Sequence, residues 1–162
     1  MVIIRQLKSG KFQEQVRHRG MRAAAKSFKT KTDAERWARH LENEVDRGIF
    51  VDRSEAQRTT MAELIDRYLN EVTPTKKSAR QEAQRLRQLK AHFRPISIAL
   101  LRNTDIAAYR DKRIKAGRAG ATVVKELASL SHLFDVSIKD WGMQLPANPA
   151  KLVRRPSVAR GP

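Results

Sequence analysis

Residues 121–141, ATVVKELASLSHLFDVSIKDW, carry the hydrophobic period of an α-helix. Large apolar residues recur there every three or four positions, at Leu127, Leu130, Phe134, Ile138 and Trp141. Residues with this spacing fall along one side of a helix, which is stable only when that side is covered by another element. The stretch therefore predicts one helix of an α-helical bundle.

Helical patterns continue upstream of this stretch. Thr60 and Glu63 fit a capping box, and Pro74 ends the apolar pattern that follows them. A second pattern of this kind begins at Ser78 and continues to Phe93. A further helix is predicted from Thr104 to Ala116, with its apolar side chains Ile106, Tyr109 and Ile114 directed inward. We therefore expect a bundle of four or five helices over residues 60–155.

The first 50 residues have a different period. Short runs at 3–7, 11–17 and 21–28 are typical of strands, and turn signals at Ser9-Gly10 and Arg19-Gly20 separate them. A helix with an N-cap at Thr32 and an apolar stripe follows. These patterns predict an α+β protein: a small three-stranded antiparallel sheet with one packing helix, then an all-α bundle. Residues 51–59 show no apolar period and are predicted to be a linker, and residues 156–162 a basic tail.

Composition limits the function. The chain has 162 residues and a net charge of +17, enough for one ordinary domain or two small ones. It contains no cysteine, which excludes disulfides and cysteine-based zinc sites. No run approaches the roughly 18 apolar residues that span a bilayer, and the apolar residues at the N-terminus are too few for a signal peptide. We expect a cytoplasmic protein, with no membrane partner.

The positive charge is clustered. Residues 1–30 carry eight basic residues and one acidic residue, and residues 74–94 carry seven basic residues and one acidic residue. Residues 31–52 carry four basic and six acidic residues. Two basic regions separated by an acidic one favour two contacts with a polyanion. Nucleic acid is the favoured partner, and a membrane surface or a ribosomal assembly are the alternatives.

No catalytic site is evident. The four histidines lie in separate segments without metal-binding spacing, and there is no Gly-rich phosphate loop and no G-x-S-x-G motif. We expect no catalytic residues, no metal and no cofactor.

Two groups of residues are candidates for nucleic-acid binding. In the first, polar side chains alternate along the second strand and cluster with nearby arginines: Arg5, Lys11, Gln13, Gln15, Arg17, Arg19 and Arg22. The second group lies on and just before the helix from Ser78 to Phe93: Lys76, Lys77, Arg80, Gln84, Arg85 and Arg87. Arg, Lys and Gln side chains on an exposed strand or helix can reach phosphates and base edges.

The motifs of the second half resemble the core-binding domain of the tyrosine recombinases, the phage integrase family. The similarity lies in Thr122-Val123-Val124-Lys125-Glu126-Leu127, Leu130-Ser131-His132-Leu133-Phe134, Trp141 and Asn148-Pro149. The first 50 residues resemble the arm-type DNA-binding domain of such integrases. That similarity lies in Ser9-Gly10-Lys11-Phe12, Val16-Arg17, Phe28 to Ala34, and Trp37.

The resemblance implies a SAM-like helical bundle and two contacts with double-stranded DNA. The sheet would bind arm-type sites, and the bundle would hold the core-type site through two helices. By position, these are the helix from Ser78 to Phe93 and the start of the last helix, around Thr122 and Lys125. Family members often have Asn at the position of Val124, so base-specific contact there is weakened, whereas Lys125 can still bind a phosphate.

The resemblance also implies catalytic residues that these 162 residues do not contain. The family's H-x-x-R pair is absent, and the two tyrosines, Tyr68 and Tyr109, occupy core positions of helices. We therefore interpret the chain as the DNA-binding portion of an integrase, without strand cleavage of its own.

Several alternatives remain at this point. One is a basic RNA-binding or ribosome-associated protein, and another is a regulatory fragment that occupies recombination sites. The expected source is a bacterium or a phage, with the protein at the nucleoid. Self-association on DNA, the target sequence and the origin of the short chain are not given by these patterns.

Overall fold

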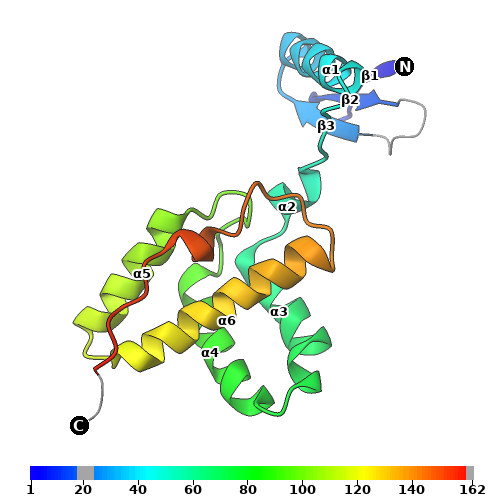
Figure 1. Cartoon of the computed structure of the whole chain (residues 1–162). Helices are drawn as coiled ribbons and strands as arrows, with labels where there is room; N and C mark the ends of the chain where they lie inside the picture. The colour runs from blue at the N-terminus through cyan, green and yellow to red at the C-terminus, as the bar shows by residue number, and fades with distance from the viewer. Residues whose placement is uncertain (18–23, 160–162) are drawn as a thin grey trace. The chain divides into compact units, whose positions relative to one another are not determined.

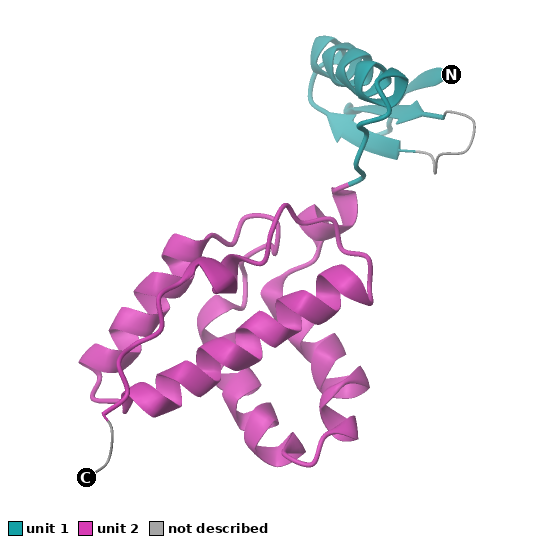
Figure 2. Ribbon diagram, viewed as in Figure 1, with its two compact units in different colours: residues 1–52 teal, residues 53–162 magenta. Residues whose placement is uncertain are grey.

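The computed structural model describes residues 1–17 and 24–159, which divide into two compact units, residues 1–52 and 53–162 (Figures 1 and 2). Unit 1 holds a three-stranded antiparallel sheet and one long helix, and unit 2 is built from helices. The predicted α+β class, with a small sheet followed by an all-α bundle, is confirmed.

The sheet of unit 1 has the strand order β1-β2-β3, with β1 at Val2–Gln6, β2 at Phe12–Val16 and β3 at Ala24–Phe28. The first turn is made where predicted, because Gly10 adopts a φ of 79°, a conformation that favours glycine. β3 was predicted from residue 21. Residues 18–23, which include Arg19 and Arg22, lie outside the described residues.

Helix α1, Lys31–Asp46, covers one face of this sheet. The core between them is small: Val16, Ala38 and Leu41 are buried, with Trp37 and Phe50 packed against them. The N-cap is Thr30, whose hydroxyl accepts from the backbone N–H of Asp33 at 3.2 Å, so the predicted cap at Thr32 was wrong. A threonine followed three residues later by an acidic residue occurs twice here, at Thr30/Asp33 and at Thr32/Glu35. The first of these pairs forms the cap.

One side chain under α1 is unexpected. The alternation of β2 places Glu14 between Phe12 and Val16, on the same face of the sheet as these two apolar residues. Glu14 is fully buried, and neither of its carboxylate oxygens has a hydrogen-bond partner among residues 1–17 and 24–159. The described part of unit 1 therefore offers this buried carboxyl group no hydrogen bond.

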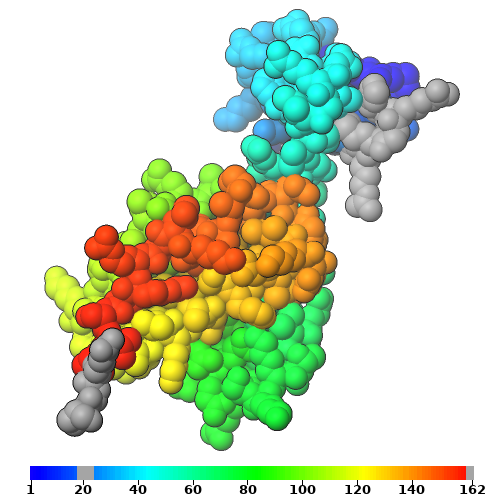
Figure 3. All heavy atoms as spheres, in the orientation of Figure 1, coloured from blue at the N-terminus to red at the C-terminus, as the bar shows by residue number. Residues whose placement is uncertain are grey.

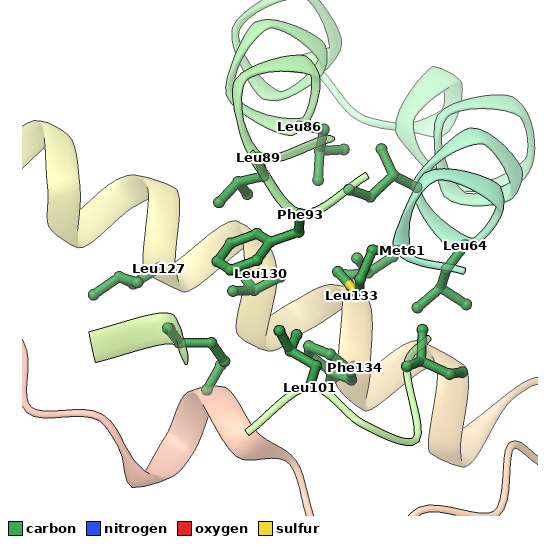
Figure 4. Packing of buried hydrophobic residues seen from close by; sticks show 14 of the residues in the cluster. Met61, Leu64, Leu86, Leu89, Phe93, Leu101, Leu127, Leu130, Leu133 and Phe134 are labelled. Atoms are coloured by element: carbon green, nitrogen blue, oxygen red, sulfur yellow. The ribbon is translucent and has the colours of Figure 1, made fainter. Parts of the chain in front are cut away.

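Unit 2 is organised around its longest helix, α6. The elements in chain order are α2 (Ser54–Arg58), α3 (Met61–Glu71), η1 (Thr73–Thr75), α4 (Ala79–Phe93), α5 (Asn103–Lys115), α6 (Gly120–Lys139) and η2 (Pro149–Leu152). Helix α6 contacts α4, α5 and η2, while α3 packs on α4. Side chains from α3, α4 and α6 converge between these helices (Figure 4), and Leu86, Phe93, Leu130 and Phe134 are fully buried there. Tyr68 and Tyr109 are buried as predicted.

Two of the helix starts in unit 2 differ in their capping. The capping box at Thr60 is confirmed, because the Thr60 hydroxyl accepts from the Glu63 N–H and the Glu63 carboxylate accepts from the Thr60 N–H at 2.8 Å. Helix α4 begins after Ser78 as expected, but the Ser78 side chain makes no capping bond.

The predicted linker at 51–59 was wrong, because residues 54–58 form helix α2. Ala56 is fully buried in the core of unit 2, and the Ser97 hydroxyl donates to the carbonyl oxygens of Ala56 and Gln57 at 3.1 and 2.9 Å. A helix of five residues is too short to show a hydrophobic period, so its order comes from these tertiary contacts.

The inward direction predicted for Ile114 was also wrong. Its side chain is 41% exposed, whereas Ile106 and Tyr109 of the same helix are buried. The position four residues after Tyr109 is Arg113, which faces inward because it pairs with Glu126 of α6.

The segment before the predicted basic tail and the start of the tail itself pack on unit 2. Val153 is buried, and the Arg110 guanidinium donates to the carbonyl oxygen of Arg154 at 2.9 Å. Farther on, the backbone of Ser157 lies against Gly120, so closely that a Cβ at Gly120 would overlap the Ser157 carbonyl oxygen. This segment crosses the surface of unit 2 (Figure 3) and covers the first turn of α6.

Candidate nucleic-acid interface

The face of the sheet that points away from α1 brings together three of the predicted residues. The strand register places Arg5 opposite Gln13, and Gln15 opposite Ile3. Because side chains alternate between the two faces of a sheet, Arg5, Gln13 and Gln15 share this face. We call it the sheet face; its members are Ile3, Arg5, Gln13, Gln15, Ala25 and Ser27.

Two more predicted cations lie at the ends of β2. Lys11 precedes the strand and Arg17 follows it, and both are exposed. Within the described ranges 1–17 and 24–159, no side-chain hydrogen bond or ion pair involves Lys11, Arg17 or Arg5. These cations are therefore available to an external anion.

A concave surface of unit 2 lies between α4 and the beginning of α6 and has a volume of about 340 Å³. We call it the α4–α6 groove; it is lined by Gln81, Gln84, Arg85, Gln88, Arg113, Arg118, Thr122, Lys125 and Glu126. Four predicted residues meet here: Gln84 and Arg85 from α4, and Thr122 and Lys125 from α6. The groove thus joins the two helices that the sequence analysis had singled out separately.

Helix geometry explains which residues line the groove. On α4, positions 81, 84, 85 and 88 follow the spacing of one helix side, next to the side that buries Leu86 and Leu89. On α6, Thr122 and Lys125 are three residues apart in the first two turns. Buried leucines therefore hold α4 in place while the neighbouring side presents polar groups.

Four residues that line the groove were not predicted as site residues: Gln81, Gln88, Arg113 and Arg118. Gln81 and Gln88 could have been found by extending the spacing of Gln84 along the helix. Arg113 and Arg118 come from the end of α5 and the following turn, and only the tertiary structure places them here.

Arg85 is held by the bundle. Its Nε donates to the hydroxyl of Ser129 on α6 at 3.1 Å. Arg80 and Arg87, on the outer side of α4, are exposed and take part in no ion pair among the described residues. The three arginines of α4 were predicted as one set. The fold holds Arg85 in place, whereas Arg80 and Arg87 face solvent.

Arg113 is fixed more strongly, by a buried carboxylate. Its Nε and Nη2 donate to Glu126 at 3.1 and 2.6 Å, and the Tyr109 hydroxyl donates to the same carboxylate at 2.8 Å. The hydrogen bond with Glu126 raises the pKa of Arg113, while burial and Glu126 raise the pKa of Tyr109. Because this pair cancels the charge of Glu126, the four cations of the groove leave a net charge of +3.

Lys76 was predicted to contact nucleic acid, but its ammonium group is held by hydrogen bonds within unit 2. Its ammonium group donates to the Tyr68 hydroxyl at 2.7 Å and to Glu82 Oε1 at 2.6 Å, and the Tyr68 hydroxyl contacts His132 Nδ1 at 2.5 Å. Burial lowers the pKa of Lys76, but the hydrogen bonds to Glu82 and Tyr68 outweigh it and the pKa is raised. Lys76 thus ties η1 to α3 and α4, whereas its neighbour Lys77 is exposed.

Other kinds of site find no support in the described part of the chain. No cluster of three or more potential metal ligands occurs there. None of the helices it contains is both long and apolar enough to cross a membrane.

Comparison with known families identifies the segment that carries the groove. The family model described as phage integrase, N-terminal domain, matches residues 57–155. The chain belongs to the phage integrase family. The matched segment contains every residue of the α4–α6 groove.

Proteins named as integrases or recombinases also have sequences similar to that of this chain. A Haemophilus influenzae protein named "Putative integrase/recombinase" is 35% identical over 152 residues, covering 93% of the chain and 40% of the relative. The "Shufflon-specific DNA recombinase" of Escherichia coli is 35% identical over 115 residues, covering 65% of the chain and 29% of the relative. The chain thus spans less than half the length of either protein. No solved structure gives a significant match.

These comparisons confirm the predicted resemblance to the N-terminal region of tyrosine recombinases. The first relative matches over nearly the whole chain, so the similarity is not restricted to the helical unit. The chain is related to proteins of DNA integration and recombination, and the surfaces above are its candidate contacts.

Proposed function

We propose that this chain binds double-stranded DNA as the N-terminal part of a site-specific tyrosine recombinase, and that these 162 residues do not themselves cleave DNA. The observation that carries the proposal is the α4–α6 groove. Within the segment matched by the family model, it gathers four cations, three glutamines and a threonine around one concave surface.

The groove has the chemistry that duplex DNA requires. Arg and Lys bind phosphates, while Gln and Thr side chains can reach base edges in the major groove, which is wide enough to admit a helix. Helix α4 is anchored by Leu86, Leu89 and Phe93, so it can contact DNA without leaving the bundle. The groove would serve as the contact for a core-type site.

The sheet face of unit 1 would supply a second, independent contact, to arm-type sites. Strands can enter a major groove, where side chains of the outer face reach phosphates and bases. Arg5, Gln13 and Gln15 share such a face, and Lys11 and Arg17 flank it. The resemblance to arm-type domains supports this assignment.

The salt dependence of binding tests the electrostatic part of the proposal. A protein that neutralises about six to ten phosphates loses affinity with a slope of about −5 to −9 in a plot of log affinity against log salt. We expect a slope in this range on a duplex. A flat titration would refute DNA binding.

A charge-matched pair of variants tests the groove itself. Arg118→Ala combined with Lys125→Ala removes two groove cations, and we expect the salt slope to become less steep by about two. The control, Arg58→Ala combined with Lys139→Ala, removes two exposed cations that lie outside the groove. Equal losses in the two double variants would argue against the groove as the contact.

The two contacts can be separated in the same assay. Arg5→Ala combined with Gln13→Ala changes only the sheet face. If the units bind different DNA sites, this variant loses affinity for one duplex class and the groove variant for another. A single duplex affected equally by both variants would contradict independent contacts.

The tyrosines support the absence of strand cleavage. Tyr68 and Tyr109 are buried, and their hydroxyls are hydrogen-bonded to neighbouring carboxylates. Burial raises the pKa of both groups, which opposes formation of a phenolate nucleophile. Nicked suicide substrates should therefore give no covalent adduct, and an adduct at either tyrosine would overturn this part of the proposal.

Structured RNA is the competing partner. The major groove of A-form RNA is deep and too narrow for side chains to read, so a helix such as α4 should favour DNA. Competition between a DNA duplex and the RNA duplex of the same sequence decides between them. Stronger binding to RNA would support the alternative of a basic RNA-binding protein.

A further inference from the structure

Helix α4 presents three glutamines to the groove, Gln81, Gln84 and Gln88. All three side chains are exposed, and their amides make no hydrogen bond with any residue that the structure describes. The buried amide of Asn148, in contrast, donates to Ser131 and Asp135 and holds η2 against α6. The glutamine amides have no such role within the fold, and both their donors and their acceptors remain unused.

The three glutamines form an uncharged stripe with cations on both sides. Arg80 and Arg87 lie along one side on the outer surface of α4, and the groove cations, including Arg118 and Lys125, lie along the other. Cations on both sides of the stripe can bind phosphates of the two DNA strands. The stripe then faces the space between the strands, where the base edges are.

The length of the stripe matches a short run of base pairs. Positions 81 and 88 are seven residues apart, which corresponds to about 10 Å along a helix with a rise of 1.5 Å per residue. Base pairs in DNA are stacked about 3.4 Å apart, so this distance covers roughly three steps. Each glutamine can therefore face a different base pair.

Two of the three groove arginines, Arg85 and Arg113, are less suited to this role, because the fold already uses part of their guanidinium groups. Arg113 donates through Nε and Nη2 to Glu126, and Arg85 donates through Nε to Ser129. An arginine that reads guanine needs two N–H groups in a fork. The three glutamine amides, in contrast to Arg85 and Arg113, remain fully available.

We propose that Gln81, Gln84 and Gln88 form a base-reading stripe that selects adenine at A·T pairs in the DNA held by the groove cations. A glutamine amide can donate to adenine N7 and accept from the adenine N6 amino group at the same time. Guanine presents two acceptors at these positions, so the amide oxygen has no donor to accept from. This inference rests on the proposed DNA binding and adds its sequence preference.

The first test is selection of binding sites from a random duplex library by the full chain. We expect enrichment of adenine within a run of about three base pairs. With Gln84→Ala, one of these positions should lose its preference, and affinity for the selected site should fall about 5- to 150-fold. Affinity for unrelated duplexes and the salt slope should not change, because no charge is removed.

A second variant predicts a change of preference instead of a loss. Gln84→Glu replaces the amide donor with a carboxylate, which accepts from the cytosine N4 amino group. The preference at the affected position should move from adenine to cytosine. The matched control is Gln57→Ala, an exposed glutamine on α2 outside the groove, which should leave the selected sequence unchanged.

The outcomes separate this inference from the function on which it rests. If the chain binds duplex DNA with a steep salt slope but selects no adenine, the base-reading stripe is refuted and DNA binding stands. The same holds if Gln84→Ala, with unchanged helical circular dichroism, weakens binding to all sequences equally. If no duplex binds at all, the proposed function fails first.

Discussion

In unit 2, Glu82 and Glu126 each lie against a tyrosine hydroxyl and a cation, whereas Glu14 in unit 1 is buried and neither of its oxygens bonds to a residue that the structure describes. All three side chains are almost completely shielded from water. A buried carboxylate is tolerated when hydrogen bonds and an opposite charge replace its hydration, and is costly otherwise. Unit 2 meets this requirement at both oxygens of Glu126 and at one oxygen of Glu82. Glu14 of unit 1 meets it at neither oxygen within the described residues.

The difference follows the size of the two cores. Unit 2 buries a continuous apolar cluster that reaches from Ala56 to Val153, while the core of unit 1 has Val16, Ala38 and Leu41 as its buried members. A unit of about 50 residues buries a smaller share of its surface than a larger one, so it has little stability in reserve. An unpaired carboxyl group in unit 1 therefore affects a larger fraction of the total stability. We expect the two units to differ most where a buried acid is changed.

The largest effect should come from Glu126→Ala. The substitution leaves the Arg113 guanidinium and the Tyr109 hydroxyl without their shared acceptor, and breaking a buried pair in this way costs about 3–5 kcal/mol. Urea unfolding of the full chain in a Trp37→Phe background measures it, because Trp141 of unit 2 is then the remaining tryptophan.

Tyr109→Phe is the control for this prediction. It removes the hydroxyl and keeps the ring and the ion pair, so we expect a loss of about 1 kcal/mol. If the two variants are equally stable, the charged pair contributes nothing and the contrast between the units is not electrostatic.

The next effect has the opposite sign, in unit 1. Glu14→Met replaces the unpaired carboxyl group with an apolar side chain of similar length, and at pH 7 it should stabilise the unit by about 1–3 kcal/mol. Amide hydrogen exchange of β2 in the full chain reports on opening of this unit alone. Glu14→Gln removes the charge but keeps polar atoms, so it should give a smaller gain.

The same position predicts a pH dependence. Burial raises the pKa of Glu14 above its ordinary value of 4.5, and the nearby charges of Glu35 and Glu42 raise it further, outweighing the opposite effect of Arg39. The folded unit therefore holds the proton more tightly than the unfolded chain, and its stability falls as the pH rises from 4.5 through the raised pKa. Glu14→Met should remove this part of the pH dependence. An advantage of the variant that stays constant from pH 4 to pH 8 would contradict the explanation.

The smallest effect compares two N-caps of the same residue type. Thr60 forms a reciprocal capping box with Glu63, and Thr30 caps α1 with the help of Asp33. Each threonine-to-alanine substitution should cost about 1 kcal/mol, measured for Thr60 by unfolding and for Thr30 by amide exchange in α1. A much larger loss at Thr30 would show that unit 1 is close to its stability limit.

Local patterns of the sequence were enough to predict the three strands and the longer helices. Strand alternation, the Thr60 capping box and the stripe of α6 each involve residues close together in the chain, and the structure contains all three. Neither the formation of helix α2 nor the inward position of Arg113 could be predicted. Each depends on a partner distant in sequence, Ser97 in the first case and Glu126 in the second.

The candidate interface shows the same limit. Gln84 and Lys125 could be selected from sequence patterns but not placed in one groove, because α5 and its turn lie between them in the chain. Lys76 was assigned to DNA on the basis of charge alone. A lysine that precedes a helix has the same sequence signature whether it faces solvent or pairs with a buried glutamate.

Gly120 leads to an unusual expectation for a mutational scan of α6. At most helix positions, alanine is favoured over glycine by up to about 1 kcal/mol. At position 120 the order should be reversed, because any side chain would push the Ser157 backbone away from the first turn of the helix. The scan would thus detect the docked C-terminal segment through one helix position at which alanine and every larger residue are disfavoured.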